Sequence, residues 1–201
     1  MNVSTSLLNR ETLAANSAVG KVRAYRVERG QWLQQTELKS NLVVFEWAAI
    51  VSKLLTTGDS RYRIGGMYLE FENVASPGAT VSIPTYDRTR SSAYYQSLSS
   101  HASRDYLRVP LIATQLLSEG AGLTDNQSVF FARSSGVVGV HGKPFAAANN
   151  STIFGAALVA YPNRTDASQD MIFSSYYLDP TDQQQKLASS QIGLEWRLTL
   201  Q

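Results

Sequence analysis

The stretch DYLRVPLIATQLL, Asp105–Leu117, decides the fold class of this chain. It is a mostly apolar segment that follows a Ser-, Tyr- and Arg-rich stretch, and it is typical of a β-strand. Val109-Pro110 within it implies a bulge or an edge position, because proline has no N–H to donate to a central ladder. Further strands are predicted from here to the end of the chain, at Ser128–Arg133, Gly136–Val140, Thr152–Tyr161, Met171–Leu178 and Ile192–Leu200.

Strand patterns also lie upstream of this stretch. Lys21–Arg29 and Gln31–Lys39 predict a β-hairpin that turns near Arg29–Gly30. Ile64–Glu72 and Thr80–Ile83 have the period of two that is typical of strands. Residues 85–104 are interpreted as a long loop with a helical turn around Ala93–Leu98, and a loop of that length is often functional.

Residues 41–57 form the one clear helical pattern. Asn41 is a suitable N-cap, and Gly58 is suited to end the helix. Apolar residues recur at helical spacing, namely Val43, Trp47, Ile50 and Leu54. A second, short helix is expected to open at Asp179-Pro180-Thr181-Asp182 and to run through Leu187.

Many short strands and one helix predict a mainly β fold, an antiparallel β-sandwich of jelly-roll type. Residues 21–201 are expected to form one domain that includes the helix. Residues 1–20 are interpreted as an N-terminal arm, either a flexible terminus or a segment that orders on a neighbouring subunit.

The composition favours burial against partners over charge-driven binding. Charged residues make up 17% of the chain, below the roughly 25% that is typical of soluble proteins, and charges are depleted from interface cores. The net charge of +2 is too small to predict nucleic-acid binding. The absence of cysteine excludes disulfides, thiolate zinc sites and a cysteine nucleophile. Neither a signal peptide nor a membrane span is indicated.

No motif carries a catalytic signature. His101 lies in a Ser-rich loop, but no G-x-S-x-G elbow accompanies it. The segment Gly136–Pro144 is similar to a phosphate-binding loop, yet Val137 replaces its first glycine and Pro144 its Ser or Thr.

The acidic pairs likewise lack the supporting ligands of a metal site. They are Asp166 with Asp170 and Asp179 with Asp182, and loop solvation and helix capping account for them. The sequence therefore predicts no catalytic, cofactor-binding or metal-binding residue, and a protein that is not an enzyme.

Arginine and tyrosine alternate around the long loop and the strand that follows it. Such a mixture is favoured at protein interfaces. Contact with single-stranded nucleic acid or a carbohydrate, or a solvated loop, are the alternatives. The candidate interface residues are Arg88, Arg90, Tyr94, Tyr95, Arg104, Tyr106 and Arg108.

Two parts of the chain resemble structural proteins of tailed bacteriophage virions. The first runs from GQWLQQTELKSNLV (residues 30–43) through LLTTG (54–58) to YRIGGMYL (62–69), and the second is QIGLEWRLTL (191–200). In such proteins a hairpin ends in Asn-Leu-Val that opens a helix, and a strand with Ile-x-x-Met follows. The resemblance covers about 45 residues of the first third and the last ten, and it implies a tail fibre, collar or adaptor part, or a capsid decoration protein.

The leading hypothesis is accordingly a non-enzymatic virion protein of the tail or the head–tail region, which binds sister copies and other virion proteins. A capsid decoration or cement protein is the first alternative. A carbohydrate-binding module that recognises a host surface through Tyr94, Tyr95 and Tyr106 is the second, and a hydrolase that uses His101 is the third. The expected location is the virion, assembled in the host cytoplasm.

Overall fold

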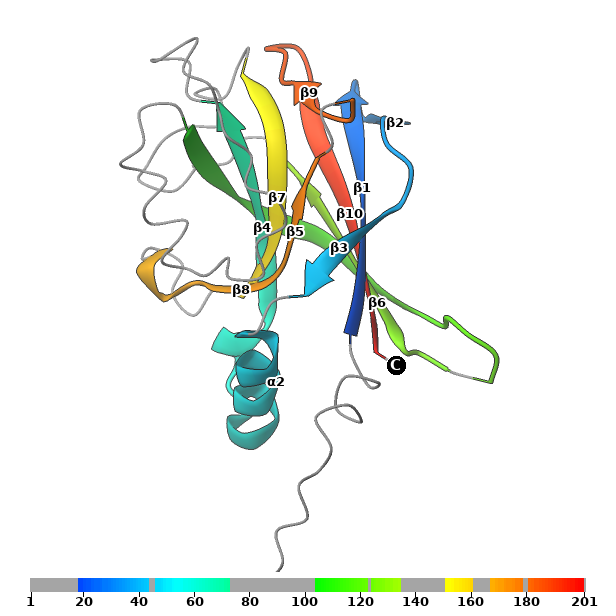
Figure 1. Ribbon diagram of the computed structural model, residues 1–201, viewed down its shortest axis with the longest axis vertical. Coiled ribbons are helices and arrows are strands. Elements are labelled where there is room, and N and C mark those ends of the chain that lie inside the picture. Colours follow the sequence, from blue (N-terminus) through cyan, green and yellow to red (C-terminus); the bar gives the residue numbers. More distant parts are fainter. Residues whose placement is uncertain are drawn as a thin grey trace, which may run out of the picture.

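The computed structural model describes residues 18–43, 46–72, 104–122, 124–134, 151–160, 167–178 and 181–200. Figure 1 shows strands that curl around a common interior, with one helix at the lower end. The strands are β1 (Ala18–Glu28), β2 (Gln31–Gln34), β3 (Lys39–Val43), β4 (Ile64–Glu72), β5 (Arg104–Leu117), β6 (Gln127–Arg133), β7 (Thr152–Ala160), β8 (Met171–Tyr177), β9 (Gln184–Gln185) and β10 (Gln191–Leu200). The helices are α2 (Glu46–Thr57) and the short 3₁₀ turns η1 (Ser60–Tyr62) and η4 (Ala167–Gln169).

The strands pair in a continuous ring. Their order is β10-β6-β5-β4-β7-β8-β3-β1, and β1 pairs in turn with β10. Every pairing among the described residues is antiparallel. The mainly β, antiparallel fold class with one longer helix is thus confirmed, and the sheet curls on itself.

Two strands carry the sheet around its bends. The first half of β5 pairs with β4 as far as Pro110, and its second half, from Leu111, pairs with β6. The register of the β5–β6 ladder shifts between Leu111 and Ala113, just after the predicted position at Val109-Pro110, where the ladder with β4 is regular. On the other side of the ring, β3 pairs with β1 through Lys39–Asn41 and with β8 through its last two residues.

The core fills the interior of the curled sheet. Alternate residues of each strand point inward, as the two-residue period of a strand requires. Trp196, Leu107, Met67 and Leu158 are 0% exposed. The helix α2 adds Ile50, which is 1% exposed, and Trp47, whose ring lies 6.2 Å from that of Phe173 on β8.

The hairpin turn and the end of the helix follow from local chemistry. Arg29 and Gly30 have φ values of 49° and 81°, as the two central residues of a type I′ turn require. Gly58 has φ 62°, and its N–H donates to the Leu54 carbonyl at 2.9 Å. Both sequence predictions are confirmed.

Asn41 does not cap a helix. It lies in β3, is 8% exposed, and pairs with Gly20 of β1. With its amide oriented to satisfy its neighbours, it donates to Ser174 Oγ (2.9 Å) and accepts from Trp196 Nε1 (2.7 Å). The prediction that the helix spans 41–57 is therefore wrong at its start, because Lys39–Val43 gains ladder partners on both sides.

Other predictions differ in detail. β1 begins at Ala18, so the last three residues of the expected arm belong to the sheet, and residues 1–17 lie outside the described residues. The helix expected through Leu187 is replaced, in residues 181–187, by a turn and the short strand β9, which pairs with β7. The strands predicted at Thr80–Ile83 and Gly136–Val140 and the helical turn at 93–98 lie outside the described residues.

Candidate functional site

Two of the three predicted interface residues on β5 are largely shielded from solvent, on the face of the strand opposite to the core residue Leu107. Tyr106 is 1% exposed, and the side chain of Arg108 is 11% exposed. Arg104 is the first residue of β5. The remaining candidates, Arg88, Arg90, Tyr94 and Tyr95, lie outside the described residues.

Arg108 and Tyr106 belong to a buried polar cluster around Asp170, which precedes β8. Arg108 Nη2 donates to Asp170 Oδ1 at 2.8 Å, and the Tyr68 hydroxyl donates to Asp170 Oδ2. The rings of Tyr68 and Tyr106 lie 4.8 Å apart. Asp170 is 1% exposed, so the interpretation of this residue as a solvated loop acid is wrong. Its partners are distant in sequence, and only the pairing of β4 with β5 brings them together.

The Asp170 cluster is suited to holding strands together. Each carboxylate oxygen of Asp170 accepts a hydrogen bond, and the arginine balances its charge. Burial and the Asp170 carboxylate raise the pKa of the Tyr68 phenol far above its usual value, and burial also raises the pKa of Tyr106. Neither phenol ionises near neutral pH, so neither is available as a general base.

The raised pKa of Tyr68 predicts a loss of stability in alkali. Because the folded pKa exceeds the unfolded value, stability is complete below about pH 10 and falls as the pH rises beyond it, by about 1.4 kcal/mol per pH unit for this group. Urea unfolding should show this loss of stability developing above about pH 10 in the unmodified chain, and the Tyr68→Phe chain should lack it. Equal losses in the two chains would contradict the prediction.

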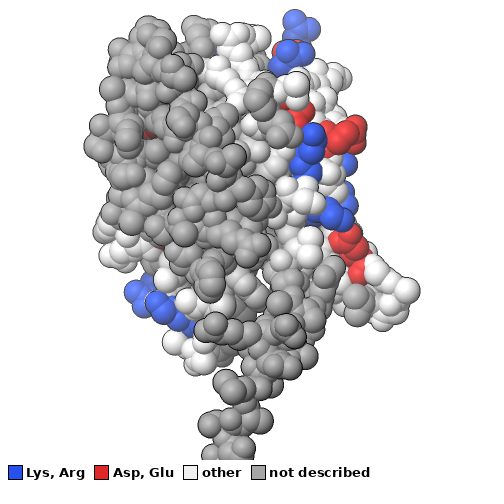
Figure 2. Space-filling view, viewed as in Figure 1, with Lys and Arg blue, Asp and Glu red and all other residues white. Residues whose placement is uncertain are grey.

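The outer face of β1, β10 and β6 carries intermixed charges and aromatic rings. The Tyr25 hydroxyl donates to Glu195 Oε2 at 2.5 Å, and Arg197 Nε donates to Glu195 Oε1 at 2.6 Å. The ring of Trp32 lies 5.2 Å from that of Tyr25, and it rests on Gly193, where a Cβ would meet it at 2.4 Å. Figure 2 shows acidic and basic side chains side by side where β1 and β2 lie, so opposite charges compensate each other locally.

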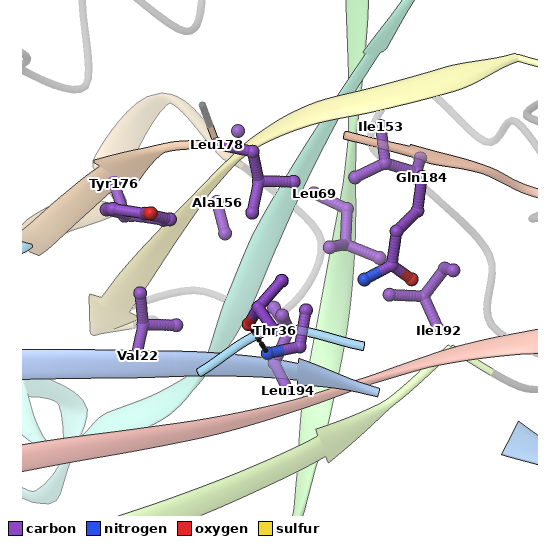
Figure 3. A pocket seen from close by; sticks show the side chains of 12 residues that line it. Val22, Thr36, Leu69, Ile153, Ala156, Tyr176, Leu178, Gln184, Ile192 and Leu194 are labelled. Atoms are coloured by element: carbon purple, nitrogen blue, oxygen red, sulfur yellow. Dashed lines mark hydrogen bonds between the residues drawn. The ribbon is translucent and has the colours of Figure 1, made fainter. Parts of the chain in front are cut away.

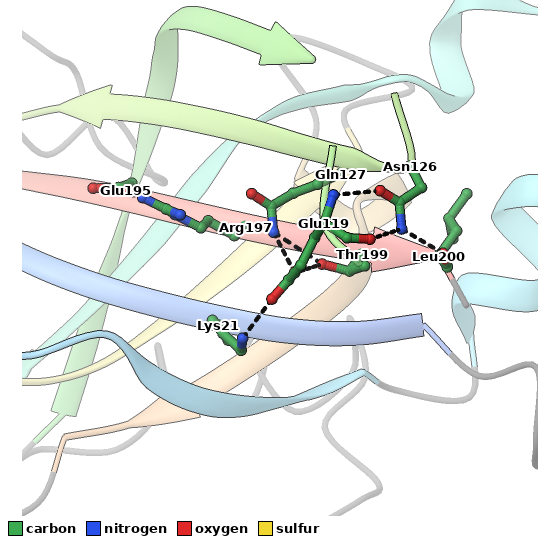
Figure 4. Close-up of polar contacts among 8 residues, drawn as sticks. All are labelled: Lys21, Glu119, Asn126, Gln127, Glu195, Arg197, Thr199 and Leu200. Atoms are coloured by element: carbon green, nitrogen blue, oxygen red, sulfur yellow. Dashed lines mark hydrogen bonds and ion pairs between the residues drawn. The ribbon is translucent and has the colours of Figure 1, made fainter. Parts of the chain in front are cut away.

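Glu119, which follows β5, joins the β5–β6 hairpin to the rest of the sheet (Figure 4). Its carboxylate accepts from Lys21 Nζ at 2.8 Å and from Thr199 Oγ1 at 2.5 Å. Gln127 Nε2 donates to it as well, at 2.5 Å. The contacts with Lys21 and Thr199 hold the pKa of this carboxyl below its usual value.

Glu119→Gln is expected to lower the unfolding free energy modestly. The side chain is 39% exposed, so solvent screening limits the loss to about 0.5–1 kcal/mol at pH 7. A depressed pKa contributes stability above the unfolded carboxyl pKa, and this contribution is lost as the pH falls through the folded pKa. Urea unfolding should therefore separate the two proteins at pH 7, and the difference should shrink as the pH is lowered through the carboxyl range.

Glu28→Gln is the matched control for this variant. Glu28 forms an ion pair with Arg26 at 3.2 Å, and both side chains are about as exposed as Glu119. Among the described residues, no hydroxyl or side-chain amide donates a hydrogen bond from another strand to the Glu28 carboxylate. A loss in Glu28→Gln as large as that in Glu119→Gln would contradict the special role of the Glu119 contacts.

A small cavity lies between the facing sides of the curled sheet (Figure 3). Its volume is about 10 Å³, which is about the room that one water molecule requires. Its lining is mostly apolar, with Leu69 and Ile153 on one side and Val22 and Leu194 on the other. A packing defect of this size does not hold an organic ligand.

Most of the exposed large apolar side chains on the described strands lie at the β5–β6 hairpin and the end of β10, with Leu33 on β2 as the exception. Ile112, Leu116 and Leu117 are 50%, 65% and 39% exposed, and Leu200 is 54% exposed. Figure 1 shows this hairpin extending beyond the body of the sheet at the lower right, beside the C-terminus. The sequence places these residues in a strand but does not show that they face solvent. The lack of charge in LIATQLL is the one signal that points to them.

The remaining sequence motifs do not form a site in the described part of the chain. His101 and Gly136–Pro144 lie outside it. Among the described residues, no group of three or more His, Cys, Asp or Glu side chains is arranged to hold a metal ion. No described helix has the length and apolar character needed to cross a membrane.

No protein-family model matches this chain, and comparisons with curated proteins and with solved structures give no match either. The function is therefore inferred from the residues of the chain itself. Their most informative surface is the exposed apolar strand at the β5–β6 hairpin.

Proposed function

We propose that this chain is a non-enzymatic structural subunit of a tailed bacteriophage virion, a tail or head–tail component that assembles through contacts with sister copies and other virion proteins. The observation that carries the assembly role is the group of exposed apolar side chains on the hairpin, Ile112, Leu116 and Leu117, with Leu200 beside them. Single exposed apolar residues are normal, but several of them within one uncharged strand segment favour a contact surface.

The chemistry of the described interior supports a structural role. Arg108 and Tyr68 both donate hydrogen bonds to the buried Asp170 carboxylate, and the described cavity has a volume of about 10 Å³ only. The low charged fraction of 17% supports extensive burial against partners. The proposed location in the virion rests on the resemblance of residues 30–69 and 191–200 to phage structural proteins.

A capsid decoration protein remains the alternative within the class of virion structural proteins. The carbohydrate-binding alternative loses one of its three contact candidates, because Tyr106 is 1% exposed. Nothing in the described residues favours a glycan over a protein partner.

Mass spectrometry of purified virions tests the proposed function. We expect peptides of this chain in particles that survive density-gradient purification, with a copy number that is a multiple of six or twelve. Several hundred copies per particle would instead indicate a capsid decoration protein. Absence from purified particles would end the proposal.

A further inference from the structure

The structure assigns a homotypic interface to the second half of β5: we propose that Leu111–Leu117 pairs antiparallel with the same segment of a second copy, about a two-fold axis at Thr114. This inference rests on the proposed assembly role and names its partner and register. We call residues 111–117 the β5 edge segment.

The β5 edge segment has one unused side. It pairs with β6 along its length, from Leu111 with Ala132 to Leu117 with Gln127. On its other side the ladder with β4 ends where Pro110 pairs with Gly66. Within the described residues, no strand continues that ladder alongside the segment, so its backbone groups on this side are open to a new strand.

Apart from the register shift between Leu111 and Ala113, the segment lacks the features that normally protect an open edge. Proteins block such edges with charges, prolines, bulges or a short strand length. LIATQLL has no charged residue and no proline, and its residues from Ile112 onward are exposed. Exposed apolar side chains on an open edge therefore favour the addition of a partner strand.

The segment is complementary to itself. An antiparallel pairing centred on Thr114 places Ile112 opposite Leu116 of the second copy and Leu111 opposite its Leu117. Thr114 then faces its own equivalent, and Thr–Thr pairs across strands are favourable. No like charges meet at the axis, which is the usual obstacle to pairing identical strands. A two-fold contact of this kind joins the same surface on both partners.

The expected contact is small and reversible. A seven-residue strand pair lies at the low end of interface sizes, below about 1,200 Å², so we expect dissociation constants in the micromolar range, around 10⁻⁶–10⁻⁴ M. Such a contact forms readily at the local concentrations of an assembly and dissociates on dilution. Measurements should therefore span a wide range of protein concentration.

A single introduced cysteine tests the register directly, because the chain has no cysteine of its own. In Thr114→Cys the two thiols face each other across the axis, at a Cα separation of about 4.5–5.5 Å, which suits a disulfide. Mild oxidation should give a disulfide-linked dimer on non-reducing gels. Thr56→Cys, the same change at an exposed position on α2, is the control and should stay monomeric. Equal yields from the two variants, or no dimer from Thr114→Cys, would overturn the proposed register.

Two leucine-to-lysine variants test the contact of the β5 edge segment without oxidation. Leu116→Lys places two charges in the contact and should weaken dimerisation at least about 10-fold in sedimentation equilibrium. Leu55→Lys makes the same change at a leucine of α2 that is 79% exposed and should leave dimerisation unchanged. Both leucines are exposed, so both variants should fold.

The outcomes separate this inference from the proposed function. A wild-type chain that stays monomeric up to millimolar concentration would overturn the β5 contact, as would a dimer that Leu116→Lys leaves intact. Either result leaves the virion assignment to the particle measurement. Presence in virions together with loss of incorporation in Leu116→Lys, but not in Leu55→Lys, would support both.

Discussion

Gly20→Ala is expected to lower the unfolding free energy by about 3–5 kcal/mol, through overpacking and the loss of buried hydrogen bonds. A Cβ at this position would lie 1.7 Å from the nearer terminal atom of the Asn41 amide, which is Nδ2 in the orientation given above, and 2.7 Å from its Cγ. The Asn41 side chain cannot move away from the new methyl group, because it is 8% exposed and lies between β1 and β8. The clash displaces its amide from Trp196 Nε1 and leaves that buried donor without an acceptor.

A double-mutant cycle identifies the cause. Asn41→Ala alone should cost about 1–3 kcal/mol, since it leaves the Trp196 N–H unsatisfied. It also removes the atoms that the new methyl group would meet, so Gly20→Ala/Asn41→Ala should be about as stable as Asn41→Ala alone. Urea unfolding of the four proteins measures the coupling. Additive losses, or a Gly20→Ala chain as stable as the wild type, would contradict the contact.

Asp170→Ala is expected to cost about 3–5 kcal/mol, because it leaves the largely buried Arg108 guanidinium without its carboxylate. The Tyr68 hydroxyl loses its acceptor at the same time. Thermal or urea unfolding at neutral pH measures the loss, and the variant should unfold at a clearly lower denaturant concentration than the wild type.

Asp59→Ala provides the matched control in an exposed pair. Asp59 contacts Arg61 at 2.6 Å, but the arginine side chain is 64% exposed, so water replaces the lost partner. Its effect should be much smaller than that of Asp170→Ala. Comparable losses in the two variants would contradict the claim that burial makes the Asp170 pair important.

Local chemistry accounts for the parts of the fold that the sequence predicts well. The turn at Arg29–Gly30 and the helix end at Gly58 need positive φ values, and glycine supplies them at low cost. The bounds of β4 follow from the two-residue alternation of Ile64–Glu72. The ladder of β5 with β4 ends at Pro110, which cannot donate a hydrogen bond.

Partners distant in sequence decide the role of each polar residue near the core. Asn41 has the local signature of an N-cap, but Gly20 and Ser174 pair beside it and make it part of a strand. Tyr106 and Arg108 fit a contact surface by composition, yet the ladder with β4 and the position of Asp170 bury them. No pattern in the sequence records these pairings, since the residues lie tens of positions apart.

By itself, the sequence determined that this protein is mainly β and antiparallel, where its tight turns lie and where its helix ends, because neighbouring residues control backbone angles and periodicity. Only the tertiary structure decided which side of each strand is buried, which charges meet, and that β5 leaves β4 at Pro110 with an apolar edge exposed. Those features depend on how the sheet curls, and the curl arises from contacts between strands that the chain brings together only on folding.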